Sequence, residues 1–312
     1  MATSLLYILV FPGFLFLVGF ALISEQLDRF LYARMQNRVG PPWFQPLADV
    51  IKLAAKEDTI PEGADRTVFR FMPVVALTAV ITAIFYVPIW SQRALQAFPG
   101  DLVVVLYLLT IPTLTFFLGG WFSRSLYSMI GAARAITQLF AYEIPLLLAI
   151  LSPAMLAGSW SISDITAFYA ARWYLVPVNL IGFGVAVVSL LGKLERVPFD
   201  IPEAETEIVA GSFTEYGGRL LAIFRLCIDI EMVVGASLIA AVFLPFGLRI
   251  HPTIGFGLYL IKIEFVIFLI SLMRTVMARL RIDQMIDFCW KYMAPLALLQ
   301  LVINLFLKGY VQ

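Results

Sequence analysis

The sequence predicts an all-α fold, a polytopic membrane bundle of about eight transmembrane helices with an amphipathic surface helix in the first loop. Of its 312 residues 61% are hydrophobic and 14% are charged, and the mean hydropathy is +0.92. A soluble domain is about 45–50% apolar and about 25% charged. The apolar runs lie too close together to leave room for a separate water-soluble domain. We therefore expect one integral membrane domain over residues 1–312.

A membrane-spanning helix needs roughly 17–25 mostly apolar residues, and eight stretches meet this requirement. In chain order they cover about 4–24, 71–90, 102–121, 138–159, 173–192, 220–245, 254–273 and 290–308. The first run has no basic segment before it and no small-residue cleavage pattern after it. It is therefore expected to be a retained span rather than a signal peptide.

The distribution of Lys and Arg predicts the orientation, because cytoplasmic loops carry an excess of both. The odd-numbered connections hold sixteen of them, whereas the even-numbered connections and both tails hold only Arg93, Arg172, Arg249 and Lys308. The large charged loops are therefore expected on the cytoplasmic side of the cell's inner (cytoplasmic) membrane. An even number of spans places both termini on the opposite side.

The first of these loops, 25–70, is expected to contain an amphipathic helix. Leu47, Val50 and Ile51 recur at helical spacing among charged residues. Pro46 precedes this segment and Pro61 follows it, and proline limits a helix at both ends. We expect this helix to lie along the membrane surface.

The segment 195–216, ERVPFDIPEAETEIVAGSFTEY, is the most informative part of the chain. It holds six carboxylates between two apolar runs: Glu195, Asp200, Glu203, Glu205, Glu207 and Glu215. Acids beside hydrocarbon are costly unless they face water, a partner or an ion path. A solvated acidic loop is the alternative, but interspersed apolar residues such as Phe199, Ile208 and Phe213 favour a segment that folds back into the bundle. If it is helical, Glu203 and Glu207 share one face.

Several charged residues lie inside the predicted spans. Glu143 is expected to be a protonatable group lining a polar path, the alternative being a carboxylate at the interface that Arg134 or a loop holds. Arg225 and Asp229 are four residues apart and are expected to pair.

Glu231 lies on a different face of that sixth span and has no partner within the helix. It is therefore the better candidate for titration. Lys262 and Glu264 in the seventh span are two residues apart and cannot face each other. Each therefore needs a partner from another helix or from a water-filled cavity.

Composition also excludes some functions. The formal charge of +1 offers no broad basic surface for nucleic acid. Cys227 and Cys289 lie far apart in apolar runs, and His251 is the only histidine. The chain is therefore expected to bind no cofactor or metal itself, so that any electrons are carried by another subunit. No internal repeat is evident, which argues against a standalone transporter.

Four motifs carry a resemblance to a known family. They are ARMQNRVGPPWFQPLADVIKLAAKE at 33–57, GAARAITQLFAYEIP at 131–145, the segment 195–216, and RLRIDQ at 279–284 followed by Trp290-Lys291. In this order, and over nearly the whole chain, they resemble the H-type subunit of complex I (the NADH dehydrogenase subunit 1 family) and its counterpart in membrane-bound hydrogenases.

The resemblance implies an eight-helix subunit beneath a peripheral redox arm. In that family the cytoplasmic loops form a crevice near the arm's last iron–sulfur cluster, and buried carboxylates lead from it to antiporter-like membrane subunits. The residues it assigns to this relay are Glu143, Glu203, Glu205, Glu207, Glu215 and either Asp229 or Glu231. Those it assigns to the crevice or to docking of the arm are Asp28, Arg29, Arg34, Arg38, Arg196, Asp200, Arg281 and Asp283.

Two departures from the family pattern bear on the branch. Asp28-Arg29 stands where complex I members have a Glu-Arg pair. The run from Arg38 to Pro46, RVGPPWFQP, lacks the extra residues of quinone-linked members and resembles ferredoxin-dependent hydrogenases and sulfur-reducing relatives. The leading hypothesis is thus a membrane coupling subunit with iron–sulfur and hydrogenase-like partners. A quinone-binding subunit of NADH:quinone oxidoreductase and a passive membrane anchor are the alternatives.

Overall fold

The computed structural model describes residues 2–91, 93–247 and 251–311, and these ranges contain helices and no strand. Arg249, one of the charges used to predict orientation, lies outside them. Eight helical segments are long and apolar enough to cross a membrane. They are Leu6–Met35, Arg66–Tyr86, Asp101–Phe122, Leu126–Ala157, Trp173–Lys193, Gly218–Phe243, Pro252–Val276 and Ile282–Tyr310. The predicted fold class is confirmed.

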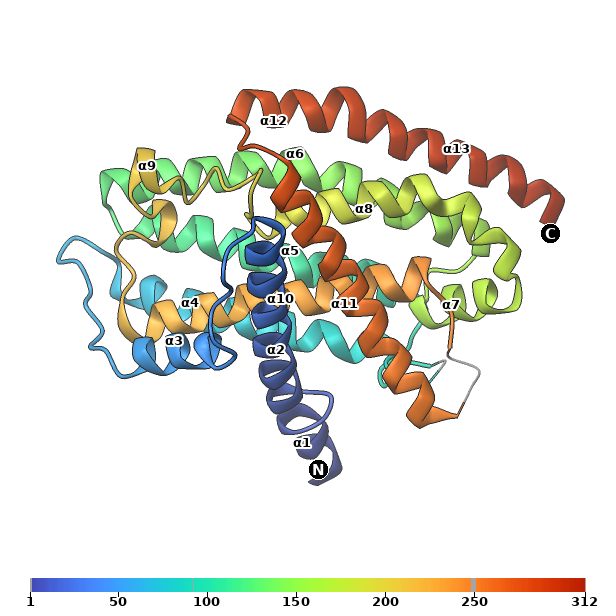
Figure 1. Cartoon of the computed structure of the whole chain (residues 1–312), viewed down its shortest axis with the longest axis horizontal. Coiled ribbons are helices and arrows are strands. Elements are labelled where there is room, and N and C mark those ends of the chain that lie inside the picture. The colour runs from blue at the N-terminus through green and yellow to red at the C-terminus, as the bar shows by residue number, and fades with distance from the viewer. Residues whose placement is uncertain (1, 92, 248–250, 312) are drawn as a thin grey trace.

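The individual helices follow in order along the chain (Figure 1). They are α1 (Ala2–Leu9), α2 (Phe14–Met35), α3 (Gln45–Ala54), α4 (Arg66–Ala83), α5 (Asp101–Phe122), α6 (Leu126–Ala157), α7 (Ile162–Ala171), α8 (Leu180–Lys193), α9 (Glu205–Ile208), α10 (Gly218–Phe243), α11 (Pro252–Val276), α12 (Ile282–Phe288) and α13 (Ala294–Val311).

Two helices extend well beyond the apolar runs that predicted them. Helix α2 continues to Met35 rather than ending near residue 24, and α6 begins at Leu126 rather than near residue 138. Charged side chains interrupt the apolar pattern there, but the backbone stays helical because the protein itself surrounds them. Glu25 and Asp28 of α2, for example, are 6% and 0% exposed.

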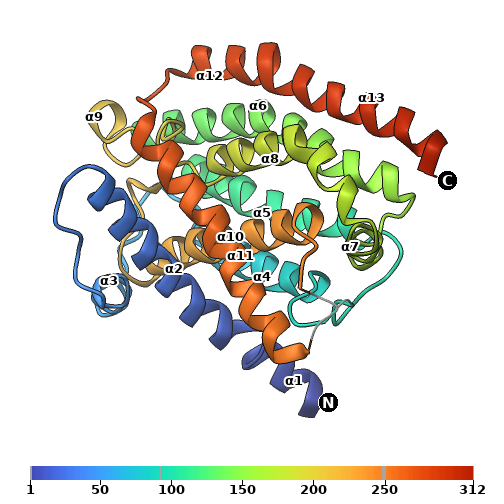
Figure 2. The same ribbon diagram turned by 45° about the vertical axis from the view of Figure 1, so that its right-hand side comes forward.

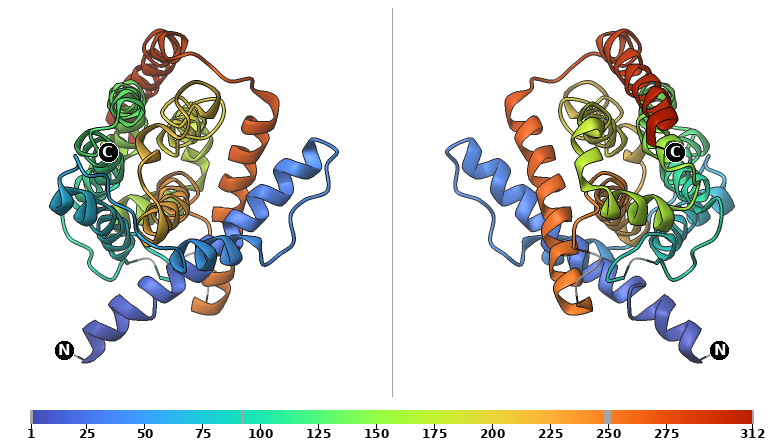
Figure 3. Two further views of the ribbon diagram at one scale, coloured as in Figure 1. Left: turned by 90° about the vertical axis from the view of Figure 1, so that its left-hand side faces the viewer. Right: turned by 90° about the vertical axis from the view of Figure 1, so that its right-hand side faces the viewer.

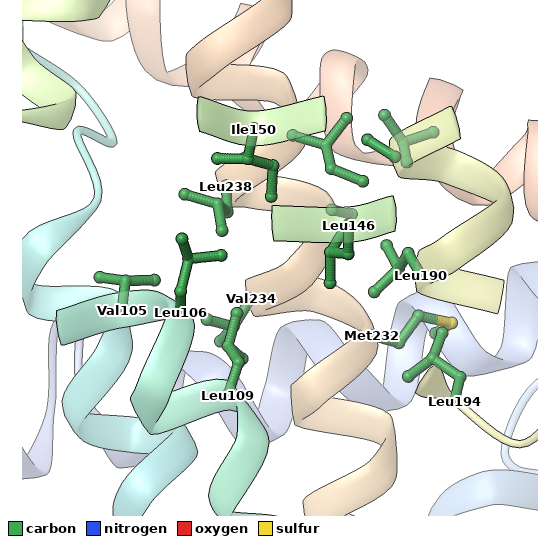
Figure 4. Packing of buried hydrophobic residues seen from close by; sticks show 14 of the residues in the cluster. Val105, Leu106, Leu109, Leu146, Ile150, Leu190, Leu194, Met232, Val234 and Leu238 are labelled. Carbon is green, nitrogen blue, oxygen red and sulfur yellow. The ribbon is translucent and has the colours of Figure 1, made fainter. Parts of the chain in front are cut away.

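Helix α10 forms the centre of the bundle. Every residue from Ile230 to Phe243 is buried, and Figure 2 shows α5, α6, α8 and α11 around it. The close-up in Figure 4 shows α5, α6 and α8 contributing Leu106, Leu146 and Leu190 to the packing against Val234 and Leu238 of α10. Apart from Glu231 and Ser237 this stretch of α10 is apolar on every side, as is typical of an enclosed helix.

Helices α2 and α11 cross on one side of this core, and α13 lies beside α6 on another (Figure 3). The predicted amphipathic helix is present as α3, and its apolar residues Leu47 and Ile51 are exposed. Its Asp49 accepts a hydrogen bond from Arg29 of α2 at 2.8 Å. That α3 lies along the membrane surface stays a prediction.

The acidic segment folds back into the bundle, as its apolar residues predicted. Phe199, Ile201, Ile208 and Phe213 are 1–4% exposed, whereas Val209 is exposed. The helix in this segment, α9, covers only Glu205–Ile208. Glu203 therefore lies outside it, and the condition for Glu203 and Glu207 to share a helix face is not met. The reason is the backbone of Ala204, whose φ of −26° and ψ of 77° are not helical, so the helix does not extend back to Glu203.

The turn at Gly211–Phe213 rests directly on the backbone of α6 at Gly131. A Cβ atom added to Gly131 would lie 2.4 Å from the backbone nitrogen of Ser212 and 2.5 Å from the Cα of Gly211. Both neighbours are backbone atoms, so no side chain can rotate to make room. Gly211 itself has a φ of +52°, a left-handed conformation that glycine adopts most easily.

We predict that Gly131→Ala lowers stability because it forces the acidic segment off α6. Overpacking of this kind costs about 1–3 kcal/mol. The measurement is the thermal unfolding midpoint of the purified complex in detergent. Gly184→Ala is the matched control, since a Cβ there meets nothing within 4 Å. Equal midpoints for the two variants would contradict this view of the packing.

Candidate functional site

A crevice of about 710 Å³ opens between α2, α3, the segment after α8, α10 and α11. Its walls are rich in charge, and they include Glu25, Arg29, Asp49, Arg196, Asp229 and Arg274. Asp200 and Glu203 from the acidic segment also line it. The predicted crevice residues Arg29, Arg196 and Asp200 are thus brought together here by parts of the chain that are far apart in the sequence.

Arg196 is the central cation of this crevice. Its guanidinium donates to Asp28 and, at 2.5 Å, to Glu25, and it lies 3.9 Å from Asp229. Burial lowers the pKa of Arg196, but the charges of Glu25, Asp28 and Asp229 outweigh burial and hold that pKa above its usual range. The planar guanidinium of Arg196 therefore holds acidic side chains of α2 and α10 against the acidic segment.

A polar seam between α2 and α11 continues from Arg196. Asp28 also accepts hydrogen bonds from Arg274 at 2.6 Å and from Ser271 at 2.5 Å. One turn of α2 earlier, Ser24 donates to Glu264 at 2.6 Å. Glu264 thus accepts a hydrogen bond from another helix, as the sequence predicted.

Lys262, two residues before Glu264, points elsewhere. Its ammonium donates to the carbonyl oxygens of Leu244 at 3.0 Å and Phe246 at 3.1 Å, just beyond the end of α10. The lysine therefore satisfies backbone carbonyls that the helix leaves free at its C-terminus.

A buried triad lies behind the crevice, where α6, α8 and α10 meet. The ammonium of Lys193 lies 3.8 Å from Glu143 and 3.7 Å from Glu231. Lys193 and Glu231 are each 1% exposed at the side chain, and Glu143 is 12% exposed. The ammonium also lies 5.4 Å from the centre of the Tyr142 ring. The alternative in which Arg134 holds Glu143 does not occur here, because Arg134 binds Glu207 at 2.7 Å.

Glu195 lies between the triad and the crevice. It is 7% exposed, and neither carboxylate oxygen has a hydrogen-bond partner among the described residues. Burial raises the pKa of Glu195 well above its ordinary value of 4.5, and the negative charges of Glu203 and Glu231 raise it further. The surroundings of Glu195 therefore favour its protonated form.

Glu203 and Asp200 of the segment form ion pairs nearer the surface. Arg225 pairs with Glu203 at 3.0 Å, so the predicted pair of Arg225 with Asp229 is wrong. Positions four residues apart share a helix face, but here the acidic segment approaches α10 and competes for the same guanidinium. Arg279 pairs with Asp200 at 3.1 Å.

Glu207 lies at an exposed edge, with 53% of its side chain accessible. The hydrogen bond and charge of Arg134 lower the pKa of Glu207. Together with Arg279, Arg281 and Asp283 these side chains line a second cavity of about 400 Å³. Glu207 thus lies among the predicted docking residues.

Other predicted site residues remain apart from the crevice, the triad and the second cavity. Arg34 and Arg38 are exposed, and Glu215 is half-buried. The side chain of Glu205 lies outside the described residues. The described residues hold no group of three His, Cys, Asp or Glu side chains placed to bind a metal ion.

Sequence reasoning did not select Glu25, Lys193, Glu195 or Arg274 as site residues. Glu25 stands four residues before Arg29, the spacing of a helical ion pair, and the two pair at 2.7 Å. Lys193 was counted only as a loop cation, because it ends an apolar run. Nothing in the local pattern marks Arg274, whose role depends on the crossing of α2 and α11.

The raised pKa of Glu195 predicts a pH dependence of stability. When the folded-state pKa of an acid lies above its unfolded-state pKa, stability is complete below the unfolded pKa and is lost as pH rises towards the folded one. As pH rises above the ordinary carboxyl range, the unfolding midpoint of the wild-type complex should therefore fall more steeply than that of Glu195→Gln. Parallel midpoint curves for the two proteins would show that Glu195 ionises freely.

Comparison with known proteins identifies the family of this chain. The family model described as NADH dehydrogenase matches residues 6–305. The H-type subunit of the NADH-quinone oxidoreductase of Carboxydothermus hydrogenoformans is 36% identical over 311 residues, which cover 96% of this chain and 86% of that protein. The corresponding subunit from Brevibacillus brevis is 33% identical and covers 94% and 90%.

Among solved structures, a chain of the membrane-bound sulfane sulfur reductase, an archaeal respiratory membrane complex, aligns with a TM-score of 0.87 and 25% identity. The alignment covers 97% of this chain and all of that one. A family match over almost the entire length, eight membrane helices and relatives above 30% identity lead to one conclusion. The chain is a multi-pass membrane protein of the NADH dehydrogenase subunit 1 family, the H-type subunits of NADH-quinone oxidoreductase.

Proposed function

We propose that this chain is the membrane coupling subunit of an ion-translocating respiratory redox complex. It anchors a peripheral electron-transfer arm and passes the effect of the arm's redox reaction through buried charged groups to antiporter-like membrane subunits. The whole chain, residues 1–312, acts as one membrane domain, with its large charged loops facing the cytoplasm and both termini on the opposite side.

The observation that supports this proposal best is a series of buried titratable groups that leads inward from the crevice. It begins at Arg196 and Asp229 in the crevice, passes Glu195, and reaches Glu231, Lys193 and Glu143. A change of charge near the crevice is felt strongly by such neighbours, because the surrounding dielectric is low.

Glu143 is the member of this series that faces away from the crevice. It lines an apolar cavity of about 460 Å³ between α5 and α6. A relay that ends here leaves the chain sideways, towards a neighbouring membrane subunit. Glu203, Glu205 and Glu215 belong to the entrance of this relay in our proposal, and Glu207 to the docking surface with Arg34, Arg38, Arg281 and Asp283.

The short run from Arg38 to Pro46 favours a ferredoxin-linked complex of the membrane-bound hydrogenase or sulfur-reductase type. The similarity to a chain of the sulfane sulfur reductase complex supports the same branch. The iron–sulfur cluster that delivers electrons then lies in an adjacent subunit, and this chain contributes only the crevice beneath it.

The relay predicts that Glu143→Gln and Glu231→Gln each abolish ion translocation and leave the complex assembled, because an amide cannot carry the proton. Translocation is measured as pH or membrane-potential formation by reconstituted vesicles during turnover. Glu62→Gln makes the same chemical change at an exposed position and serves as control.

Normal ion pumping by both buried variants would refute the relay. Loss of assembly in the docking variant Arg281→Gln, with subunits released on purification, would favour the passive anchor. The anchor hypothesis makes the charges serve binding alone, so it expects docking variants such as Arg281→Gln to have the larger effect on assembly and the buried ones to leave pumping normal.

A second candidate function is quinone reduction in the crevice between α2 and α3, as the name of the NADH-quinone oxidoreductase relatives suggests. The crevice volume of about 710 Å³ favours it, whereas the many charged side chains on its walls do not. A photoreactive quinone analogue incubated with the purified complex discriminates the two. Labelling of α2 or α3 that excess quinone prevents would establish this candidate, and absence of labelling would favour the ferredoxin-linked branch.

A further inference from the structure

The triad differs from an ordinary buried ion pair in its geometry. A single ammonium, that of Lys193, lies at nearly equal distances from two carboxylates, 3.8 Å from Glu143 and 3.7 Å from Glu231. Both distances allow electrostatic attraction, but both exceed the range of a hydrogen bond. Lys193 therefore forms a hydrogen bond with neither acid.

Most polar atoms of the triad also lack a hydrogen-bond partner. The ammonium of Lys193, one oxygen of Glu143 and both oxygens of Glu231 are buried and have no hydrogen-bond partner among the described residues. Buried polar atoms normally have partners. A shift of the flexible lysine side chain towards either acid would complete one strong, charge-assisted hydrogen bond and leave the other acid without a cation.

Charge balance then fixes the number of protons. The groups that face the ammonium are Glu143 and the Tyr142 ring from α6 and Glu231 from α10, with Glu195 beyond them in the segment after α8. One positive charge neutralises one carboxylate. The second carboxylate, enclosed in a low-dielectric interior with no other cation within 4 Å in the part of the chain that the structure describes, must bind a proton.

We propose that Lys193 is a two-position switch and that the Glu143–Lys193–Glu231 triad holds one shared proton. When the ammonium pairs with Glu231, Glu143 carries the proton, and when it moves to Glu143, Glu231 carries it. The direction in which the proton moves rests on the proposed function, and the switch supplies the central step of that relay.

The step conserves charge and protons. In the first state Glu143 is neutral and Lys193 pairs with ionised Glu231. Glu143 then releases its proton to water or to a basic side chain of a neighbouring subunit, and Lys193 shifts to the new carboxylate. Glu231, left without its cation, takes up a proton from the side of Glu195. The triad returns to neutrality, and one proton enters as one leaves.

The test is infrared spectroscopy of the purified complex, which detects the carbonyl band of protonated carboxyl groups. Glu143→Gln and Glu231→Gln should each remove one such band relative to wild type. The reason is that the remaining acid is then the only carboxyl group beside Lys193, so it ionises and pairs with the ammonium. Lys193→Met should add one band, because both acids must then be protonated. Glu62→Gln is the control and should change nothing.

A band that persists in one of the two Gln variants would show that the remaining acid stays protonated beside Lys193. The lysine could then not pair with that acid, and the switch would be overturned. An unchanged band in both would exclude a shared proton in the triad. The two Gln variants keep the test decisive even if Lys193→Met fails to assemble. Because the bands are read without turnover, normal pumping by these variants would count against the proposed function alone.

Discussion

The structure depends on how its buried carboxylates are balanced inside a membrane. A pair of unit charges about 4 Å apart attracts by about 1 kcal/mol in water and by about 4 kcal/mol at an effective dielectric of about 20. Every buried acid must therefore share a cation, bind a proton or reach water. Around the crevice Arg29, Arg196 and Arg274 balance Glu25, Asp28 and Asp229. Behind it, Lys193 lies near both Glu143 and Glu231.

The kind of cation differs between the crevice and the triad. Guanidinium groups, with several donors in one plane, hold the parts that must keep a fixed geometry, namely α2, α10, α11 and the acidic segment. The single buried ammonium of the triad lies instead on a flexible stem between two acids. Rigid pairing at the crevice and loose pairing behind it are what a subunit needs if it must dock an arm firmly and still let a proton move.

The packing of the acidic segment connects these two parts. Tyr216 stacks on Phe69 of α4 with ring centres 3.9 Å apart, and Phe213 packs on Phe116 of α5. These aromatic contacts hold the segment against the bundle, so Glu195 and Arg196 at its start cannot drift into water. A displacement of the segment would change the charge around the triad directly, and this gives a physical route from the crevice to Glu143.

The sequence by itself determined the fold class, the number and order of the spans and the amphipathic helix α3, because apolar length and helical periodicity are local properties. Its motifs also identified the family, and they named Arg29, Arg196 and Asp200, which line the crevice. Tertiary structure decided which charges meet. The pairing of Arg225 with Glu203 rather than Asp229, the burial of Glu195 and the place of Lys193 between two acids all depend on helices distant in sequence. Local spacing cannot predict such pairings, because the way the helices cross and the acidic segment folds back decides which charged side chains come into contact.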